Sequence, residues 1–371
     1  MSSGKKWRAL PMVTAAALVL VMAACGSSSK SGSSSGSSKT KTIGVILPDT
    51  TTSPRWEAND RPSLNAAFTA AGFKGDIQNA GGDKTKFGTI CSSMINEGVS
   101  VLMIVNLDSN SGGACLKKAA AAGIKSIDYD RLTLGGGASY YVSFDNVEVG
   151  KLQGEGLQKC LDTAGKTKAN IVYINGDPTD NNAALFKSGY VAALKPKIDS
   201  GDYKLVGDQS GFWDATKAGN AFQQLYTQNK GKIDGVVSAN DTMAGGIIAR
   251  LTQDGVAGKV PVTGQDASVG GLQQILAGNQ CVTVYKNTNL EAQAASKLAI
   301  DLTKGDTAAA DALANGSVMD TTTHQAVKSV LATPVAITTA NIEQPFKDGF
   351  AKASAVCVDK FAALCTKYGV S

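Results

Sequence analysis

From Lys41 onward, short apolar runs alternate with helix-like stretches, and this alternation constrains the fold more than any other feature. In the first part of the chain, runs of strand length stand at residues 42–47, 76–79, 99–105 and 124–129. Helix-like stretches lie between them at 55–71, 85–97 and 112–122. Strands that alternate with helices form parallel sheets with helices on both faces. The pattern therefore predicts a doubly wound α/β sheet.

The same alternation restarts after Asn146. Apolar runs stand at 170–175, 203–207, 233–239, 260–263 and 281–285, with helical stretches at 147–161, 181–194, 215–229, 243–253 and 269–276. A further helix at 290–302 has no strand of this second sheet left to join. The simplest topology returns it to the first sheet. We therefore expect an α/β protein of two Rossmann-like lobes, joined by several hinge strands.

The length of the chain predicts more than one domain. About 330 residues follow Lys41, more than one hydrophobic core usually holds. We expect a signal peptide (1–24), a tether (25–40), a first lobe (41–144 plus 287–330), a second lobe (145–286), and a hinge return with a C-terminal tail (331–371). A last strand is expected at 335–338 and a helix at 358–367, whereas the polar stretch 304–329 predicts no element.

The N-terminus has the features of a bacterial lipoprotein signal. Basic residues precede an uncharged apolar run at 9–24, and small residues lead to Cys25. A membrane-spanning anchor is the alternative, but a span needs about 20 apolar residues and this run is shorter. The serine- and glycine-rich stretch 27–40 predicts a flexible tether. We expect an extracytoplasmic protein, anchored to the outer face of the bacterial cell membrane by a lipid on Cys25.

Composition excludes several classes of function. Without residues 1–24, which carry 3 of the 36 Lys and Arg and no acid, 33 basic residues face 31 acidic ones, so no nucleic-acid partner is expected. The single histidine, His324, lies far from any strand end and builds neither a catalytic triad nor a metal cluster. No glycine-rich phosphate loop follows a strand. We predict a monomeric protein that is not an enzyme and needs no metal or cofactor.

The cysteines indicate disulfide bonds. If Cys25 carries lipid, six remain, and an even number in an exported protein is typical of disulfides. Six cysteines allow 15 connectivities. Cys91 and Cys115 fall on consecutive predicted helices of one lobe, so we expect them to pair. Cys357 and Cys365 lie eight residues apart in the tail and form the second expected pair. Cys160 and Cys281 then pair by elimination. Buried free thiols are the alternative.

Polar and aromatic side chains gather where the predicted strands end. Ten of them are candidate ligand-binding residues: Arg55, Trp56, Asp130, Arg131, Asp180, Asn182, Trp213, Asn240, Asp266 and Lys286. Ligands of open α/β sheets bind at the carboxyl ends of the strands. Carboxylates and amides engage neighbouring hydroxyls, Arg and Lys donate hydrogen bonds, and Trp covers an apolar ring face. The set therefore suits a neutral polyol.

Some of these residues have an alternative role as helix N-caps. Asp180 and Asn240 stand directly before predicted helices, where Asp and Asn are favoured. Arg131 and Trp213 are not capping types, so they indicate a binding site more strongly. A lone tryptophan is alternatively a core residue.

Eight motifs stand in a fixed order, and all of the candidate residues except Trp213 lie in six of them: PRWEANDRPSLNAAF, ICSSMINEGVSVLMIV, AAAAGIKSIDYDR, YYVSFDNVEVGKLQGEGL, INGDPTDNNAALFKSGY, KIDGVVSANDTMAGGIIARL, GKVPVTGQDA and AGNQCVTVYKNTNLEA. From about Lys41 to Phe350 the chain resembles the xylose-binding periplasmic proteins of bacterial ABC importers. The six cysteines and the tail 357–371 lie outside the close resemblance.

That resemblance implies the type I periplasmic binding protein fold, in which two lobes close on one monosaccharide. Carried over by motif, the sugar site comprises Arg55 of PRW, Asp130 and Arg131 of YDR, Asp180 and Asn182 of TDNN, Trp213 of GFW, Asn240 of AND, Asp266 of GQDA and Lys286 of VYK. The implied partners are xylose or a similar aldose and a membrane permease. A sensory subunit that reports sugar to a membrane receptor is the alternative, and a secreted Rossmann-type enzyme is disfavoured by the missing phosphate loop.

Overall fold

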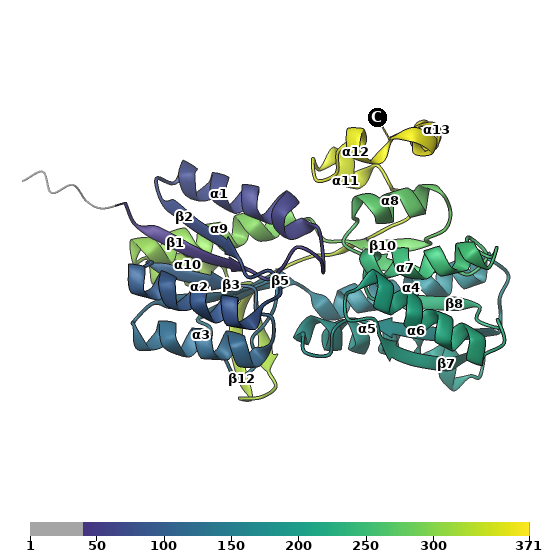
Figure 1. Cartoon of the computed structure of the whole chain (residues 1–371), viewed down its shortest axis with the longest axis horizontal. Coiled ribbons are helices and arrows are strands. Elements are labelled where there is room, and N and C mark those ends of the chain that lie inside the picture. Colours follow the sequence, from purple (N-terminus) through teal and green to yellow (C-terminus); the bar gives the residue numbers. More distant parts are fainter. Residues whose placement is uncertain (1–39, 371) are drawn as a thin grey trace, which may run out of the picture. The chain divides into compact units, whose positions relative to one another are not determined.

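The computed structural model describes residues 40–370. Its largest sheet has seven strands (Figure 1). Neighbouring strands are parallel except for the antiparallel pair at one edge. The strand order is β11 (Gly316–Asp320), β12 (Gln325–Ala332), β5 (Tyr140–Phe144), β4 (Lys125–Tyr129), β3 (Val101–Ile104), β1 (Thr42–Leu47) and β2 (Lys74–Asn79). The predicted signal peptide, the lipid site Cys25 and residues 25–39 of the tether lie outside the described residues.

Helices cover both faces of this sheet, which explains why its central strands read as continuous apolar runs. All four residues of β3 are buried. One face packs against α1 (Arg61–Ala70), α9 (Thr288–Lys304) and α10 (Thr307–Leu313). The other face packs against α2 (Lys84–Glu97) and α3 (Ser109–Ala121). A π-helical turn, η1 (Trp56–Asp60), precedes α1. This sheet and its helices form the first lobe.

The second lobe contains two three-stranded sheets that share one core. One sheet has the order β7 (Tyr203–Ser210), β6 (Ala169–Asn175), β8 (Gly235–Ser238), and the other has the order β13 (Val335–Ile337), β10 (Val282–Tyr285), β9 (Thr263–Gln265). A parallel bridge between Val236 and Val262 joins them. The helices of this lobe are α4 (Asn146–Thr163), α5 (Asn181–Asp199), α6 (Ala215–Gln228), α7 (Asp241–Gln253) and α8 (Val269–Leu276).

Three segments of the described chain connect the lobes. They follow β5, β10 and β12, at residues 144–146, 285–288 and 332–335. The second of these segments leads into α9, whose buried residues, such as Ala295 and Leu298, lie in one cluster with strand residues of the first sheet. The predicted class, two doubly wound α/β lobes, is confirmed.

The structure differs from the sequence prediction in three segments. The helix expected at 55–71 is divided into η1 and α1, because the hydrogen-bond pattern changes before Arg61. The stretch 304–329, which predicted no element, contains α10, β11 and most of β12. β11 and β12 form a hairpin in which only Asp320 and Ser329 are buried, so the two strands lack the apolar signature of a buried strand. The helix expected at 358–367 is shorter, with a 3₁₀ turn before it.

A C-terminal segment, residues 341–370, packs on the second lobe. It contains α11 (Gln344–Lys347), α12 (Ala353–Val356), η2 (Asp359–Phe361) and α13 (Ala362–Lys367). Its buried residues Ile342, Val356, Cys365 and Val370 lie in one apolar cluster with α8. No helix of residues 40–370 is long and apolar enough to cross a membrane.

Disulfides join the six cysteines of the described chain in three pairs. Cys91 on α2 pairs with Cys115 on α3, with 5.9 Å between their Cα atoms. Cys160 on α4 pairs with Cys281, which precedes β10, at 6.4 Å. Cys357 pairs with Cys365 inside the C-terminal segment, at 5.7 Å. The first links two helices on one face of the first sheet, and the second ties α4 to the sheet that it covers.

Glycines let the helices of the second lobe cross in direct contact. A Cβ atom at Gly150 of α4 would lie 1.9 Å from the carbonyl oxygen of Phe186 on α5. A Cβ atom at Gly246 of α7 would lie 1.9 Å from the carbonyl oxygen of Ala215 on α6. Backbone therefore touches backbone at both crossings, and no side chain fits there.

Alanine at position 246 should destabilise the fold, whereas alanine at the adjacent position 245 should not. A Cβ atom at Gly245 meets nothing within 4 Å, so G245A gains helix propensity of up to about 1 kcal/mol. G246A forces α6 and α7 apart, and overpacking of this kind costs about 1–3 kcal/mol. Urea unfolding followed by circular dichroism measures both variants. Equal stabilities for G245A and G246A would contradict the close crossing.

Candidate functional site

A polar cavity lies where strands of both lobes end. Its volume is about 30 Å³, so the side chains that line it lie close to one another. The ten residues that the sequence indicated all line it: Arg55, Trp56, Asp130, Arg131, Asp180, Asn182, Trp213, Asn240, Asp266 and Lys286. Arg55 and Trp56 follow β1, and Asp130 and Arg131 follow β4, whereas the other six follow β6, β7, β8, β9 and β10. Parallel strands explain the convergence, because their carboxyl ends meet at one edge of each sheet.

Arg55 is fixed by three buried carboxylates. Its Nε and Nη2 donate to the two oxygens of Asp60 at 2.9 and 2.7 Å, and its Nη1 donates to Asp130 Oδ2 at 2.7 Å. Nη2 also donates to Glu291 of α9. The Tyr129 hydroxyl donates to Asp60 from the other side. Four of the five N–H groups of the guanidinium are thereby engaged, and one on Nη1 is left for a ligand.

Asp130 connects the two lobes. Besides Arg55, it pairs with Lys286, which follows β10, at 3.4 Å between Oδ2 and Nζ. Asn182, at the start of α5 in the second lobe, donates from Nδ2 to the backbone oxygen of Asp130 at 2.9 Å and to its Oδ1 at 3.2 Å. One buried carboxylate therefore contacts a residue of the first lobe, a residue of the second lobe and a residue of a connecting segment.

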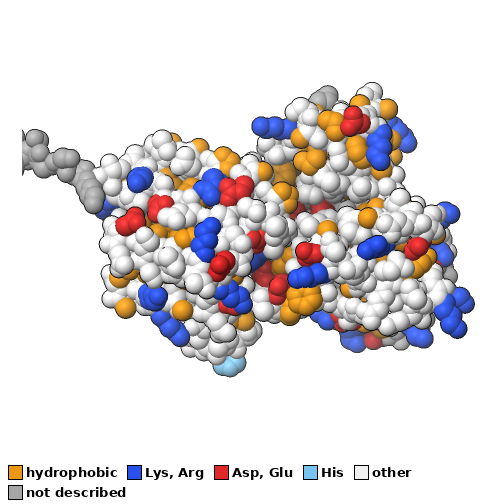
Figure 2. All heavy atoms as spheres, viewed as in Figure 1, with side chains coloured by type: hydrophobic (Ala, Val, Ile, Leu, Met, Phe, Trp, Pro, Cys, Tyr) orange, Lys and Arg blue, Asp and Glu red, His pale blue; other side chains and the backbone are white. Residues whose placement is uncertain are grey.

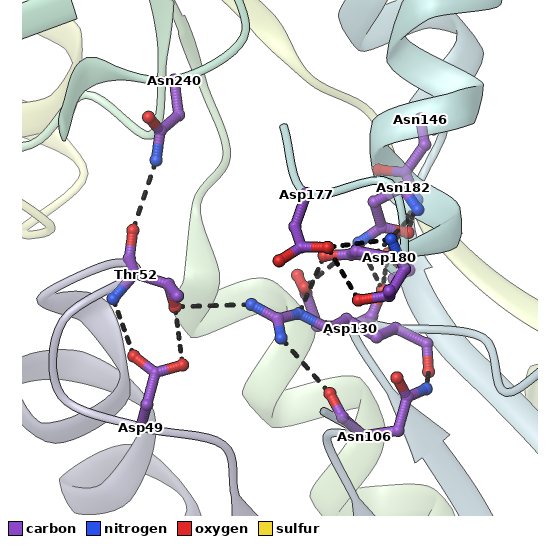
Figure 3. Close-up of polar contacts among 12 residues, drawn as sticks. Asp49, Thr52, Asn106, Asp130, Asn146, Asp177, Asp180, Asn182 and Asn240 are labelled. Carbon is purple, nitrogen blue, oxygen red and sulfur yellow. Dashed lines mark hydrogen bonds and ion pairs between the residues drawn. The ribbon is translucent and has the colours of Figure 1, made fainter. Parts of the chain in front are cut away.

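Arg131 makes a second ionic contact between the lobes. Its Nε lies 3.0 Å from Oδ2 of Asp180, the N-cap of α5. Its Nη1 donates to the backbone oxygen of Asn106 at 3.2 Å, and its Nη2 donates to Thr52 Oγ1 at 3.4 Å (Figure 3). The Trp56 ring lies beneath the guanidinium, with 5.6 Å between Arg131 Cζ and the ring centroid. Trp56 thus presents an aromatic surface beside two cations, since Arg55 Cζ lies 4.5 Å from the same centroid.

Two further hydrogen bonds join the lobes at the opposite rim. Ser53 Oγ donates to Asp266 Oδ2 at 3.2 Å. Asn240 Nδ2 donates to the backbone oxygen of Thr52 at 3.3 Å, while its Oδ1 accepts from Met243 N–H at 2.9 Å (Figure 3). Asn240 is therefore a helix cap and a cavity residue at once, so the two roles that its position suggested do not exclude each other.

Trp213 forms an apolar wall of the cavity. Its indole lies against the backbone after β6, where a Cβ atom at Gly176 would come within 2.0 Å of the ring, so only glycine fits there. Phe186 meets the indole edge to face, with 6.2 Å between centroids. The buried Trp213 Nε1 has no hydrogen-bond partner within residues 40–370. This wall therefore offers an apolar face together with an unused donor.

Three cavity residues have a backbone conformation that is rare for residues other than glycine. The φ angles are 62° at Asp130, 57° at Trp213 and 105° at Asp266. A positive φ costs such a residue about 1–3 kcal/mol, and it persists only where surrounding contacts enforce it. Backbone strain of this kind clusters at functional sites.

The three carboxylates of the cavity have different protonation behaviour. Burial by itself would raise the pKa of Asp130, but the charges of Lys286 and Arg55 hold that pKa below its ordinary value. Burial raises the pKa of Asp180 and of Asp266 above the ordinary value, although neighbouring cations oppose the rise. Asp130 is therefore the most firmly ionised acceptor of the cavity.

Four further residues line the cavity: Thr52, Ser53, Phe186 and Gln265. Gln265 is the last residue of β9 and adjoins Asp266, so it fits the strand-end pattern. The pattern misses the other three. Glu291 and Asp60 lie behind the cavity on helices, where a carboxylate gives no sequence signal. Their role in fixing Arg55 depends on how α9 and η1 pack.

Asp128 anchors the loop that carries Asp130 and Arg131. Its oxygens accept from the amide and the hydroxyl of Thr133, both at 2.7 Å. Asn106 Nδ2 donates to the same hydroxyl at 2.9 Å. Burial raises the pKa of the Asp128 carboxyl to about 7.

The stability of the protein should depend on pH through Asp128. Because its pKa is raised from 3.8 to about 7 in the folded state, the folded protein holds a proton that the unfolded chain releases between these values. The contribution of Asp128 to stability is therefore complete below pH 4 and is lost as the pH rises through 7, by at most about 1.4 kcal/mol per pH unit. In D128N the amide can bond Thr133 without titrating. We expect the unfolding free energy of wild type minus that of D128N, measured by urea unfolding, to fall between about pH 4 and 7 and to stay constant above that range. A constant difference would contradict the assignment.

The site shows no arrangement for catalysis by metal or histidine. Among residues 40–370 no group of His, Cys, Asp and Glu side chains could hold a metal ion. His324 is exposed in the turn between β11 and β12. Lys, Arg, Asp and Glu side chains are interspersed on the face shown in Figure 2.

Two α/β lobes that enclose a cavity of paired charges, amides and aromatic rings define a protein of the two-lobed ligand-binding class.

Comparison with known proteins gives the family. The periplasmic binding protein domain matches residues 43–307. The chain is 37% identical to the D-xylose-binding periplasmic protein of Escherichia coli (strain K12), across 81% of this chain and 88% of that protein. It is 34% identical to a multiple sugar-binding periplasmic receptor of Rhizobium radiobacter, across 83% of this chain and 90% of that one. A carbohydrate transporter solute binding protein from Chloroflexus aurantiacus, solved with D-glucose, superposes with a TM-score of 0.77 at 27% identity over 85% of this chain and 98% of that chain.

The chain belongs to the periplasmic binding protein family, whose members are binding proteins and not enzymes. The resemblance to xylose-binding proteins that the motifs indicated is confirmed.

Proposed function

We propose that this protein captures one monosaccharide, xylose or a similar aldose, in the cavity between its lobes and delivers it to an ABC importer. The observation that carries the proposal is that ten strand-end residues from both lobes line a single cavity. The names of the related proteins support a sugar ligand, since two of them are D-xylose-binding and one binds multiple sugars.

The charges of the cavity favour a neutral ligand with many hydroxyl groups. Three cations (Arg55, Arg131 and Lys286) and three carboxylates (Asp130, Asp180 and Asp266) line the cavity. The lining thus holds equal numbers of cations and carboxylates, so it has no excess charge that would call for an anion or a cation. A sugar hydroxyl donates to a carboxylate and accepts from an arginine or lysine, so both signs are used. The indole of Trp213 can cover the C–H face of the ring.

Specificity follows from the burial of these groups. A sugar that lacks one hydroxyl leaves a buried donor or acceptor without a partner, at a cost of about 1–3 kcal/mol. The remaining N–H of Arg55 and the Nε1 of Trp213 are two such donors. Hydrogen bonds such as Ser53 to Asp266 and Asn182 to Asp130 would hold the lobes together around the sugar, in the manner of hinge closure.

A sensory role is the second candidate, favoured by one relative. The multiple sugar-binding protein of Rhizobium radiobacter is named a receptor. A sensor needs the same cavity and the same closure. The two roles differ in the membrane partner, so uptake of labelled sugar by cells that lack the protein separates them: loss of uptake supports import.

Isothermal titration of residues 41–371 should show one sugar per chain. The protein is first unfolded and refolded to strip retained ligand, and is then titrated with xylose, arabinose, ribose, glucose, galactose and fructose. We expect binding of one or two of these sugars. Absence of heat with all six, from a folded sample, would contradict the proposed ligand class.

Arg131→Ala and Asp266→Ala should lose most of the sugar affinity while the fold is kept. Each removes one buried partner, which corresponds to a loss of about ten- to hundredfold. Arg250→Ala is the matched control, because Arg250 bonds Asn220 and Gln253 on the outer surface of α6 and α7. Wild-type affinity in R131A or D266A would remove that residue from the site.

We also propose that Cys25 carries a lipid that anchors the protein to the outer face of the cell membrane. The proposal rests on the sequence, because Cys25 lies outside the described residues. Cells fed an alkyne-tagged fatty acid should label the wild-type protein but not a Cys25→Ser variant. A Cys91→Ser variant controls for labelling of other cysteines. Equal labelling of wild type and Cys25→Ser would contradict lipidation at this position.

A further inference from the structure

The C-terminal segment, residues 341–370, packs beneath two residues of the cavity wall. Its buried side chains Ile342, Val356 and Cys365 share one apolar cluster with Ala267 and Tyr285. Ala267 directly follows Asp266, and Tyr285 directly precedes Lys286. The segment thus shares a core with the immediate neighbour of one candidate anion and of one candidate cation.

The loop at Asp266 depends on its contacts for its shape. Asp266 and Ala267 have φ angles of 105° and 50°, and neither is glycine. Two consecutive residues of this kind relax toward ordinary angles unless packing prevents it. Ala267 is 1% exposed, and its methyl group belongs to the cluster that the C-terminal segment completes.

Polar contacts hold the same loop from within the second lobe. Asp266 N–H donates to the backbone oxygen of Val284 at 2.9 Å, and Ala267 N–H donates to Thr283 Oγ1 at 3.1 Å. Ser268 N–H donates to Oδ2 of the buried Asp241 at 2.8 Å. These bonds fix the backbone amides, whereas the apolar contact of Ala267 fixes the opposite side of the loop.

The segment is itself held in place by three further contacts. The Phe350 ring lies 5.0 Å from the Tyr285 ring, between centroids. Gln273 Nε2 on α8 donates to the backbone oxygen of Val356 at 3.1 Å. The Cys357–Cys365 disulfide closes the turn between α12 and α13. The first two contacts tie the segment to β10 and α8, and the disulfide ties two parts of the segment to each other.

We propose that the disulfide-bonded C-terminal segment is a positioning element that keeps Asp266 in its ligand-facing conformation. Val356 is its central positioning residue, because it is fully buried in the shared cluster. The segment touches no ligand and acts through Ala267. The effect on sugar affinity rests on the proposed function, whereas the effect on the loop does not.

Hydrogen–deuterium exchange tests the positioning without any ligand. In Val356→Ala, the amides of residues 266–268 should exchange about tenfold faster, because the packing that enforces the strained loop is weakened. The amides of β6 are the internal reference and should keep their rates. Val358→Ala is the matched control, since Val358 lies two residues further and is 39% exposed. A merely structural effect would speed exchange in β6 as well.

The Cys357→Ser/Cys365→Ser variant repeats the test by a different change, which keeps the proposal testable if Val356→Ala does not fold. It should show the same selective increase at residues 266–268. Faster exchange within 353–367 without any change at 266–268, in either variant, would overturn the proposal.

Sugar affinity gives a second readout. Val356→Ala should weaken binding about five- to tenfold in the wild-type background but cause no further loss in an Asp266→Asn background, because the two changes act on one contact. An equal loss in both backgrounds would overturn the coupling to Asp266. If wild type binds none of the six sugars, the proposed function fails, and the exchange result alone decides the positioning.

Discussion

The buried carboxylate of Asp130 is the interaction on which the arrangement of the site depends. It accepts from Arg55 of the first lobe, lies within ion-pair distance of Lys286 after β10, and accepts from Asn182 of the second lobe. A charge taken out of water is strongly unfavourable unless partners surround it. Because these partners come from both lobes and a connecting segment, the complete set surrounds the carboxylate only when the lobes meet at the cavity.

Several other residues of the cavity also have more than one structural role. Asp180 and Asn240 each accept a backbone N–H at a helix start and also face the cavity, so one side chain caps a helix and offers a polar group. Asp130, Trp213 and Asp266 line the cavity and have positive φ angles. Glycine at position 176 leaves the space for the Trp213 indole. Each feature follows from where a parallel strand ends, which is why the site could be located from the sequence.

The fold was predictable to the extent that its elements are buried on both faces. Central strands such as β1 and β3 are continuous apolar runs, and their positions were found from the pattern of apolar residues along the sequence. The edge hairpin of β11 and β12 was not found, because exposed strands such as β11 carry no apolar period. The carboxylates Asp60 and Glu291 that fix Arg55 were also missed, since a helix residue that faces a buried arginine looks like any other acid in the sequence.

By itself, the sequence determined the class of fold, the family, and the ten side chains that gather at the strand ends. These depend on local signals: the alternation of apolar runs and helices, the residues after each strand, and motifs in a fixed order. Only the tertiary structure decided which charges pair across the lobes, and that the C-terminal segment shares a core with the neighbours of Asp266 and Lys286. Those contacts join residues far apart in the chain, and their geometry depends on how whole elements pack.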